Sequence, residues 1–202
     1  MTSGLNLRSL QPEGEAKGAP ETLIIAVYAA ADGPERAERF ASQWQPMVPG
    51  VQFLGLELAD MLWRVDVSSV QRIVAEAAAL RGLGPAQILL LGLGEGGRLA
   101  VELVVTGVLP VLGVIAYDIP LPNADLPRHR SAAAVRLIQQ NTPDDPGNTR
   151  FRALTRDLQR QGMDVRAILL PEGSLWSHDM PMRAGTAFLL ELVARASLIP
   201  PR

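Results

Sequence analysis

The sequence predicts one α/β domain, in which a mostly parallel sheet of about six strands is covered by helices on both faces in three layers. Short apolar runs bounded by turn residues recur along the chain, and stretches with apolar residues at helical spacing lie between them. Strands that alternate with helices are typical of a parallel sheet. The chain has 202 residues, of which 48% are hydrophobic and 20% charged, so it is long enough to bury a sizeable core.

Each strand and helix is predicted from its own residues. The apolar runs with the length of buried strands are residues 23–28, 51–56, 88–91, 111–117, 134–139 and 165–170. Apolar residues recur at helical spacing in residues 34–45, 67–80, 98–105, 149–161 and 182–196. Phe40 and Trp44 form the apolar stripe of the first helix, and we expect them in the core together with Trp63. Asp66 precedes the second helix and is a candidate N-cap.

The first 21 residues differ in composition from the rest of the chain. They are rich in Gly, Pro, Ser and charged residues, which predicts a flexible tail or an added edge segment. We therefore place a single α/β domain at residues 22–202. The segment has no apolar stretch typical of a signal peptide, so we expect a cytoplasmic protein.

The composition excludes several classes of function. Nineteen basic and 21 acidic residues give a net charge of −2, which argues against a nucleic-acid partner. The absence of cysteine excludes disulfides, thiol nucleophiles and Cys-ligated zinc. Two histidines, His129 and His178, are too few for a His-rich metal site, so we expect no metal. We also expect no cofactor. The apolar stretch at residues 99–117 is interrupted by Glu102 and Pro110, which argues against a membrane span.

Residues that could carry chemistry follow three of the predicted strands. A glycine-rich turn, GLGEGG (residues 92–97), follows the strand at 88–91. Asp144 and Asp145 follow the strand at 134–139, and His178 follows the last strand. Ligands bind at the carboxyl ends of the strands in open α/β sheets, so we expect the functional site at these turns.

Four segments resemble the phospholipase/carboxylesterase family of the α/β-hydrolases, which includes acyl-protein thioesterase-like proteins, and their order and spacing along the chain agree with that family. ILLLGLGEGGRLAVELVVTGVLPVLGVIAY resembles the strand, the G-x-S-x-G-G turn and the buried helix of that family. WRVD (residues 63–66) resembles its W-x-x-D, VRLIQQNTPDDP its acidic turn, and LLPEGSLWSHDM its histidine loop. The resemblance covers most of the chain from Leu23 onward and implies an α/β-hydrolase fold and carboxylic-ester hydrolysis.

The sequence departs from the family at two positions. The resemblance places the nucleophile at Gly94, which has no hydroxyl to attack a carbonyl, so a covalent acyl-enzyme step is excluded there. The His-Gly that opens the oxyanion loop of the family is Tyr28-Ala29 in this chain.

The resemblance assigns the remaining site positions as well. It places the acid at Asp145, or at Asp144 one residue earlier, and the base at His178. The backbone N–H groups of Ala30 and Glu95 take the oxyanion-hole positions. Each of these residues also has a structural interpretation: the aspartates suit a turn, Glu95 suits the first turn of a helix, and either histidine suits an exposed loop.

We therefore predict a non-catalytic relative of the carboxylesterases, a pseudoenzyme that keeps a site for a small acyl or ester-like ligand or a surface for a partner. A homodimer is compatible with this prediction. One alternative is a hydrolase without a covalent step, in which His178 and Asp145 activate water. Glu95 is a second, weaker candidate for the base in that reaction.

The glycine-rich turn supports a further alternative, a dinucleotide-binding protein. Gly92, Gly94 and Gly97 satisfy G-x-G-x-x-G between a predicted strand and a helix. Asp118 ends the next predicted strand, where a carboxylate binds the ribose in dinucleotide-binding folds. Two strand–helix units precede the turn, however, and the hydrolase resemblance accounts for three further segments. We rank nucleotide binding second.

Overall fold

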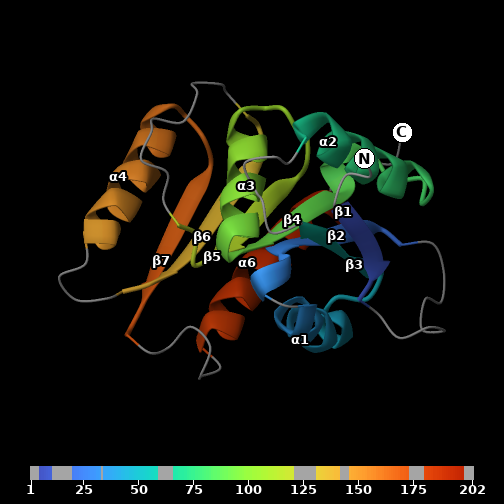
Figure 1. Cartoon of the computed structure of the whole chain (residues 1–202), viewed down its shortest axis with the longest axis horizontal. Helices are drawn as coiled ribbons and strands as arrows, with labels where there is room; N and C mark the ends of the chain where they lie inside the picture. The colour runs from blue at the N-terminus through green and yellow to red at the C-terminus, as the bar shows by residue number, and fades with distance from the viewer. Residues whose placement is uncertain are drawn as a thin grey trace.

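The computed structural model of the chain contains a seven-stranded sheet with helices on both faces (Figure 1). It describes residues 5–10, 20–32, 34–58, 66–120, 131–141, 146–172 and 180–197. The strands are β1 (Leu5–Ser9), β2 (Thr22–Ala29), β3 (Val51–Leu58), β4 (Ile88–Leu93), β5 (Gly113–Tyr117), β6 (Ala134–Gln140) and β7 (Val165–Leu170). The α helices of the described residues are α1 (Pro34–Trp44), α2 (Val67–Ala79), α3 (Gly94–Val105), α4 (Pro146–Arg160) and α6 (Met180–Ser197).

The strands lie in the order β1-β3-β2-β4-β5-β6-β7. All neighbouring strands are parallel except β1, which pairs with β3 in the antiparallel direction. The predicted fold class, a mostly parallel sheet between two helical layers, is confirmed. The predicted strands are all present, and β1 is a seventh that comes from the N-terminal segment. Leu5 and Leu7 of β1 pack against the core, which attaches this strand to the edge of the sheet.

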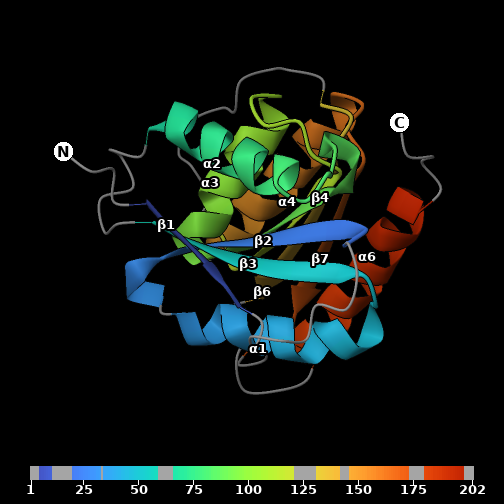
Figure 2. The same ribbon diagram turned by 90° about the vertical axis from the view of Figure 1, so that its right-hand side faces the viewer.

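The buried apolar side chains form two clusters, one on each face of the sheet. Helices α2, α3 and α4 cover one face, and α1 and α6 cover the other (Figure 2). All residues of β2 are buried, with Ile25 and Val27 in one cluster and Ile24 and Ala26 in the other. Burial on both faces explains why this strand is a continuous apolar run rather than an alternating one.

An aromatic cluster joins α1 and α6 to the sheet. The ring of Phe40 lies 5.0 Å from that of Trp44 and 4.7 Å from that of Tyr117. Trp44 Nε1 donates a hydrogen bond to Thr186 Oγ1 (3.1 Å), and the Tyr117 hydroxyl donates one to the carbonyl of Pro181 (3.1 Å). Phe40 and Trp44 are therefore core residues, as predicted, whereas Trp63 lies outside the described residues.

Helices α2 and α3 begin in different ways, the first with a side-chain cap and the second with glycines. Asp66 caps α2 as predicted: its carboxylate accepts hydrogen bonds from the Ser69 hydroxyl (2.7 Å) and the Ser68 N–H (3.1 Å). The predicted start of the next helix at residue 98 was wrong, since α3 begins at Gly94. The intrinsic helix propensity of the glycines is low, and tertiary packing of this turn against the sheet overrides it.

A cluster of charged residues fixes α6 to the amino-terminal ends of β6 and β7. Arg136 is fully buried in β6, and its guanidinium donates hydrogen bonds to the carboxylates of Asp164 and Glu191. Arg195 of α6 pairs with both acids, and Arg166 of β7 pairs with Glu191. Paired carboxylates satisfy the buried charge, so we assign a structural role to this cluster.

Within the described ranges, no helix is long and apolar enough to cross a membrane. The same residues contain no group of three or more His, Asp or Glu side chains placed to hold a metal ion.

Candidate functional site

The strand order places the candidate site between the carboxyl ends of β2 and β4. The chain runs from β2 to β3 on one side and then crosses back to β4 on the other side of β2. Such a reversal is the point at which open α/β sheets bind ligands. The register pairs Val27 with Gly92, so Ala29 at the end of β2 and Gly94 at the start of α3 each follow two residues after this pair.

Gly94 forms a sharp turn between β4 and α3. Leu93 is extended, with φ −121° and ψ 127°, whereas Gly94 has φ +52° and starts the helix. Only glycine adopts this left-handed conformation without a steric penalty. The position at which the resemblance placed a nucleophile thus lies at a strand-to-helix turn, as in a nucleophile elbow, and carries no side chain.

Three neighbouring glycines let this turn pack tightly. A Cβ on Gly92 would lie 2.4 Å from the Cα of Gly97, and a Cβ on Gly97 would lie 2.8 Å from Ile119 Cγ2. A Cβ on Gly96 would lie 2.5 Å from the carbonyl oxygen of Val27. Close packing of α3 on β2 and β4 therefore requires these glycines, whether or not a ligand binds at the turn.

The two predicted oxyanion-hole residues follow the ends of neighbouring strands. Ala30 starts a 3-10 turn, Ala30–Asp32, directly after β2. Glu95 is the second residue of α3, and the N–H groups in the first turn of a helix have no acceptor within the helix. The partial positive charge of that helix end favours a carbonyl or carboxylate oxygen.

The Glu95 carboxylate is held by α3 itself. It accepts a hydrogen bond from Arg98 Nε (2.9 Å), and Arg98 Nη1 also reaches the carboxylate of Glu102 (3.3 Å). The side chain of Glu95 is 45% exposed, so this is a solvated ion pair along the helix surface. The carboxylate is thus engaged along α3, and its position does not single it out as a general base.

The acid and base positions, Asp144, Asp145 and His178, lie outside the described residues, as does His129. The strands that precede these positions are β6 and β7, which are neighbours in the same parallel sheet. The carboxyl ends of β6 and β7 therefore lie at the same end of the parallel strands as Gly94. The acid position follows β6 in the sequence, and His178 follows β7.

Tyr28, which stands at the His position of the family motif, packs away from the turn. Its hydroxyl accepts a hydrogen bond from Arg8 Nε (3.2 Å), and Arg8 Nη2 donates to Glu38 Oε1 of α1 (3.0 Å). Burial raises the pKa of Tyr28 above its ordinary value. This link between β1, β2 and α1 was not predicted, because nothing in the sequence pattern indicates that these three residues meet.

Asp118, the predicted ribose-binding residue of the nucleotide alternative, is part of a turn after β5. Its backbone has φ +47°, and its N–H donates to the carbonyl of Ile138 (2.9 Å). Its carboxylate accepts a hydrogen bond from Gln139 Nε2 (3.0 Å). The contact with the neighbouring strand gives Asp118 a structural role at this edge of the sheet.

No sequence model of a protein family matches this chain, and no curated protein sequence matches it. Solved structures match over nearly the whole chain. The crystal structure of esterase PE8 has a TM-score of 0.70 at 18% identity and covers 94% of this chain and 98% of its own. The apo form of Thermogutta terrifontis esterase 2 has a TM-score of 0.67 at 14% identity and covers 98% and 92%. The structure of YahD with malic acid has a TM-score of 0.66 at 12% identity and covers 95% and 100%. The chain therefore has the same fold as these two esterases and YahD.

Proposed function

We propose that this protein binds a small acyl or ester-like ligand at the turn between β4 and α3 and forms no covalent intermediate with it. The observation that carries the proposal is Gly94: it holds the left-handed conformation of the turn at φ +52° and has no hydroxyl. Acyl transfer to an enzyme requires a nucleophilic side-chain atom. Binding requires only hydrogen-bond donors and a suitable cavity. Backbone N–H groups supply such donors whatever the side chain is.

The backbone at the site suits the oxygen of a carbonyl or carboxylate group. Ala30 and Glu95 follow the ends of β2 and β4, and the first turn of α3 presents N–H groups with no acceptor in the helix. Among proteins of this fold, Thermogutta terrifontis esterase 2 has been solved with propionate bound and YahD with malic acid. Small carboxylates are therefore the first ligands to test.

Titration with propionate, followed by amide chemical shifts, tests the proposal. We expect saturable shifts in the wild type. Glu95→Pro removes the N–H of residue 95 in the first turn of α3, where this N–H has no acceptor within the helix, and we expect it to weaken binding about tenfold, the equivalent of 1.4 kcal/mol. Glu95→Gln keeps that N–H while losing the charge and the ion pair with Arg98, so it is the matched control and should bind normally. A wild type without saturable shifts for propionate, malate or a short ester would contradict the proposal.

A separate esterase assay tests the hydrolytic alternative. If the wild type hydrolyses p-nitrophenyl acetate and His178→Ala removes the activity, then water activation by His178 and Asp145 replaces our proposal. We expect hydrolysis at the background rate for both proteins.

A further inference from the structure

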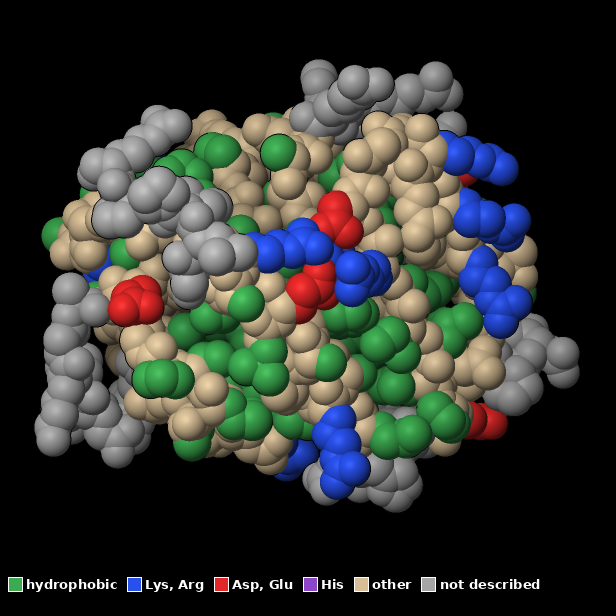
Figure 3. Space-filling view, turned by 180° about the vertical axis from the view of Figure 1, so that it is seen from behind, with side chains coloured by type: hydrophobic (Ala, Val, Ile, Leu, Met, Phe, Trp, Pro, Cys, Tyr) green, Lys and Arg blue, Asp and Glu red, His purple; other side chains and the backbone are tan. Residues whose placement is uncertain are grey.

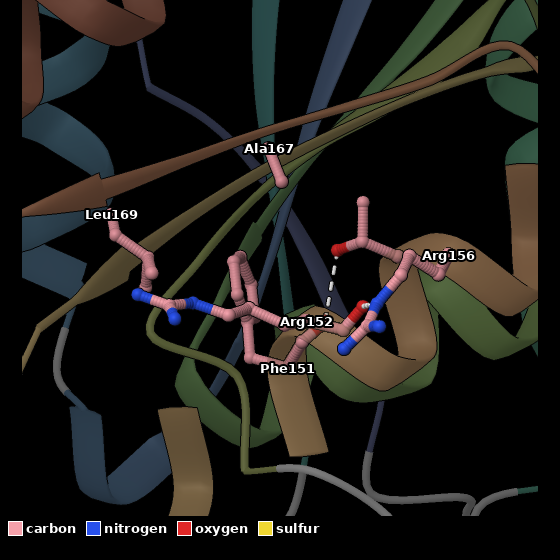
Figure 4. A pocket seen from close by; sticks show the side chains of 6 residues that line it. Phe151, Arg152, Arg156, Ala167 and Leu169 are labelled. Atoms are coloured by element: carbon pink, nitrogen blue, oxygen red, sulfur yellow. Dashed lines mark hydrogen bonds between the residues drawn. The ribbon is translucent and has the colours of Figure 1, made fainter. Parts of the chain in front are cut away.

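An open groove of about 310 Å³ lies between α4 and β7, at the opposite sheet edge from β1 (Figure 4). Its lining residues are Phe151, Arg152, Thr155, Arg156, Ala167 and Leu169. Phe151 is buried and forms an apolar floor, whereas the two arginines and Ala167 are exposed. The Thr155 hydroxyl donates to the carbonyl of Phe151 (2.9 Å), so it is satisfied within the helix.

One outward carbonyl of β7, that of Val165, accepts a hydrogen bond from Gln159 Nε2 of α4 (3.0 Å). The backbone beyond it, beside the groove, pairs with no strand other than β6 among the described residues. The carbonyls of Asp164 and Leu170 accept hydrogen bonds from the β6 side, from the N–H groups of Val135 and Asn141. Because successive residues of a strand alternate in direction, the N–H and C=O groups of Ala167 and Leu169 point to the outer edge. Among the described residues, no strand pairs with this edge. An unpaired strand edge is a template for another extended segment.

The surface beside this edge is basic. Arg152 and Arg156 line the groove one helical turn apart, and Arg150 and Arg160 lie on the same helix. Arg160 pairs with Asp157, but no ion pair of Arg152 or Arg156 is present among the described residues. Figure 3 shows Arg side chains gathered along the side of the molecule that carries α4 in Figure 1. An acidic occupant would therefore complement the groove.

We propose that the edge of β7 binds an extended acidic segment of a partner protein as an additional strand. Its backbone would pair with Ala167 and Leu169, and its acidic side chains on the α4 side would meet Arg152 and Arg156. A second copy of this chain is the poorer occupant. Pairing two β7 strands would bring two sets of α4 arginines together, and like charges that face each other oppose association.

A short peptide of about eight residues that alternates Glu with Val is a suitable probe. We expect fluorescence anisotropy to show saturable binding to the wild type. The same peptide with N-methylated backbone amides keeps its charge but cannot pair with a strand edge, so its binding should be at least about tenfold weaker. Equal binding of the two peptides would show simple charge attraction and would overturn the proposal.

Two variants locate the site on the protein. Arg152→Glu combined with Arg156→Glu should abolish binding of the acidic peptide, because repulsion replaces attraction. Arg160→Glu reverses a charge on the same helix outside the groove and should leave the affinity within about threefold of the wild type. Ala167→Pro removes an outward N–H without breaking a hydrogen bond to β6. The variant should therefore fold but no longer bind the peptide.

Three further outcomes would overturn the proposal. One is an affinity unchanged by the double charge reversal. A second is binding to vesicles that contain phosphatidylserine with no binding of the peptide. The third is a dimer, seen by analytical ultracentrifugation, that Ala167→Pro dissociates.

Discussion

A Cβ atom on Gly96 would lie 2.5 Å from the carbonyl oxygen of Val27, so the first turn of α3 rests directly on the backbone of β2. No side chain separates the two elements at this point. The contact fixes Glu95, one residue before Gly96, relative to the end of β2, and thereby sets the geometry of the candidate site.

Gly96→Ala should destabilise the protein by about 3 kcal/mol, because backbone atoms rather than a flexible side chain occupy the position of the new methyl group. Urea unfolding would measure this change in the free energy of unfolding. In Gly84→Ala the nearest atom is 3.9 Å from the new Cβ, so this control should change stability by less than about 1 kcal/mol. A stable Gly96→Ala variant with unchanged propionate affinity would show that neither folding nor ligand binding depends on the contact between Gly96 and Val27.

Gly94→Ser should allow labelling by a fluorophosphonate probe, whereas the wild type should show no labelled serine. An L residue at φ +52° is strained by about 1 kcal/mol, and the His-Gly of the family is missing, so we expect only weak esterase activity. Gly94→Ala carries the same strain without the hydroxyl and is the control. If adding His178→Ala leaves the rate of Gly94→Ser unchanged, the triad geometry has been lost and the site serves binding alone.

NAD and NADP should not change the melting temperature. A ligand that binds only the folded state stabilises it by RT ln(1 + [L]/Kd), which is about 2.7 kcal/mol at a hundredfold excess over Kd. The Asp118 carboxylate accepts a hydrogen bond from Gln139 within the protein, so we expect no such effect in a thermal scan. A shift of several degrees that disappears in Asp118→Ala would favour dinucleotide binding instead.

Stability should fall as the pH decreases from about 4 to about 2 because of Asp164. Hydrogen bonds from Arg136 and Arg195 lower the pKa of this carboxyl from 3.8 to about 2 in the folded protein. The folded state therefore binds the proton less readily than the unfolded state, and this contribution is present above pH 4 and is lost as the group protonates. The side chain is 38% exposed, so screening limits the contribution to on the order of 1 kcal/mol.

Asp164→Asn should reduce the slope of melting temperature against pH in this window. Asp157→Asn removes an exposed carboxylate that pairs with Arg160, and it should leave the slope close to that of the wild type. An unchanged slope in Asp164→Asn would contradict the assignment of this pH dependence to the Asp164 carboxyl.

Much of the fold could be predicted because burial leaves a periodic trace in the sequence. The continuous apolar run of β2 and the helical spacing of Phe40 and Trp44 report local environments, and the structure confirms both. The pattern was less informative where packing overrides local preference. The start of α3 at Gly94 is one such case, and the complete burial of Arg136 in β6 is another, because its distant partners Asp164 and Glu191 balance the charge.

The amino-acid sequence by itself determined that residue 94 has no nucleophile, because a hydroxyl that is absent from the covalent structure cannot be supplied by folding. Only the tertiary structure decided that β2 lies between β3 and β4, that Gly96 touches Val27, and that β7 is the last strand of the described sheet, beside Arg152 and Arg156. The reason is physical: side-chain periodicity records whether a segment is buried, whereas strand order and close approach depend on contacts between residues far apart in the chain.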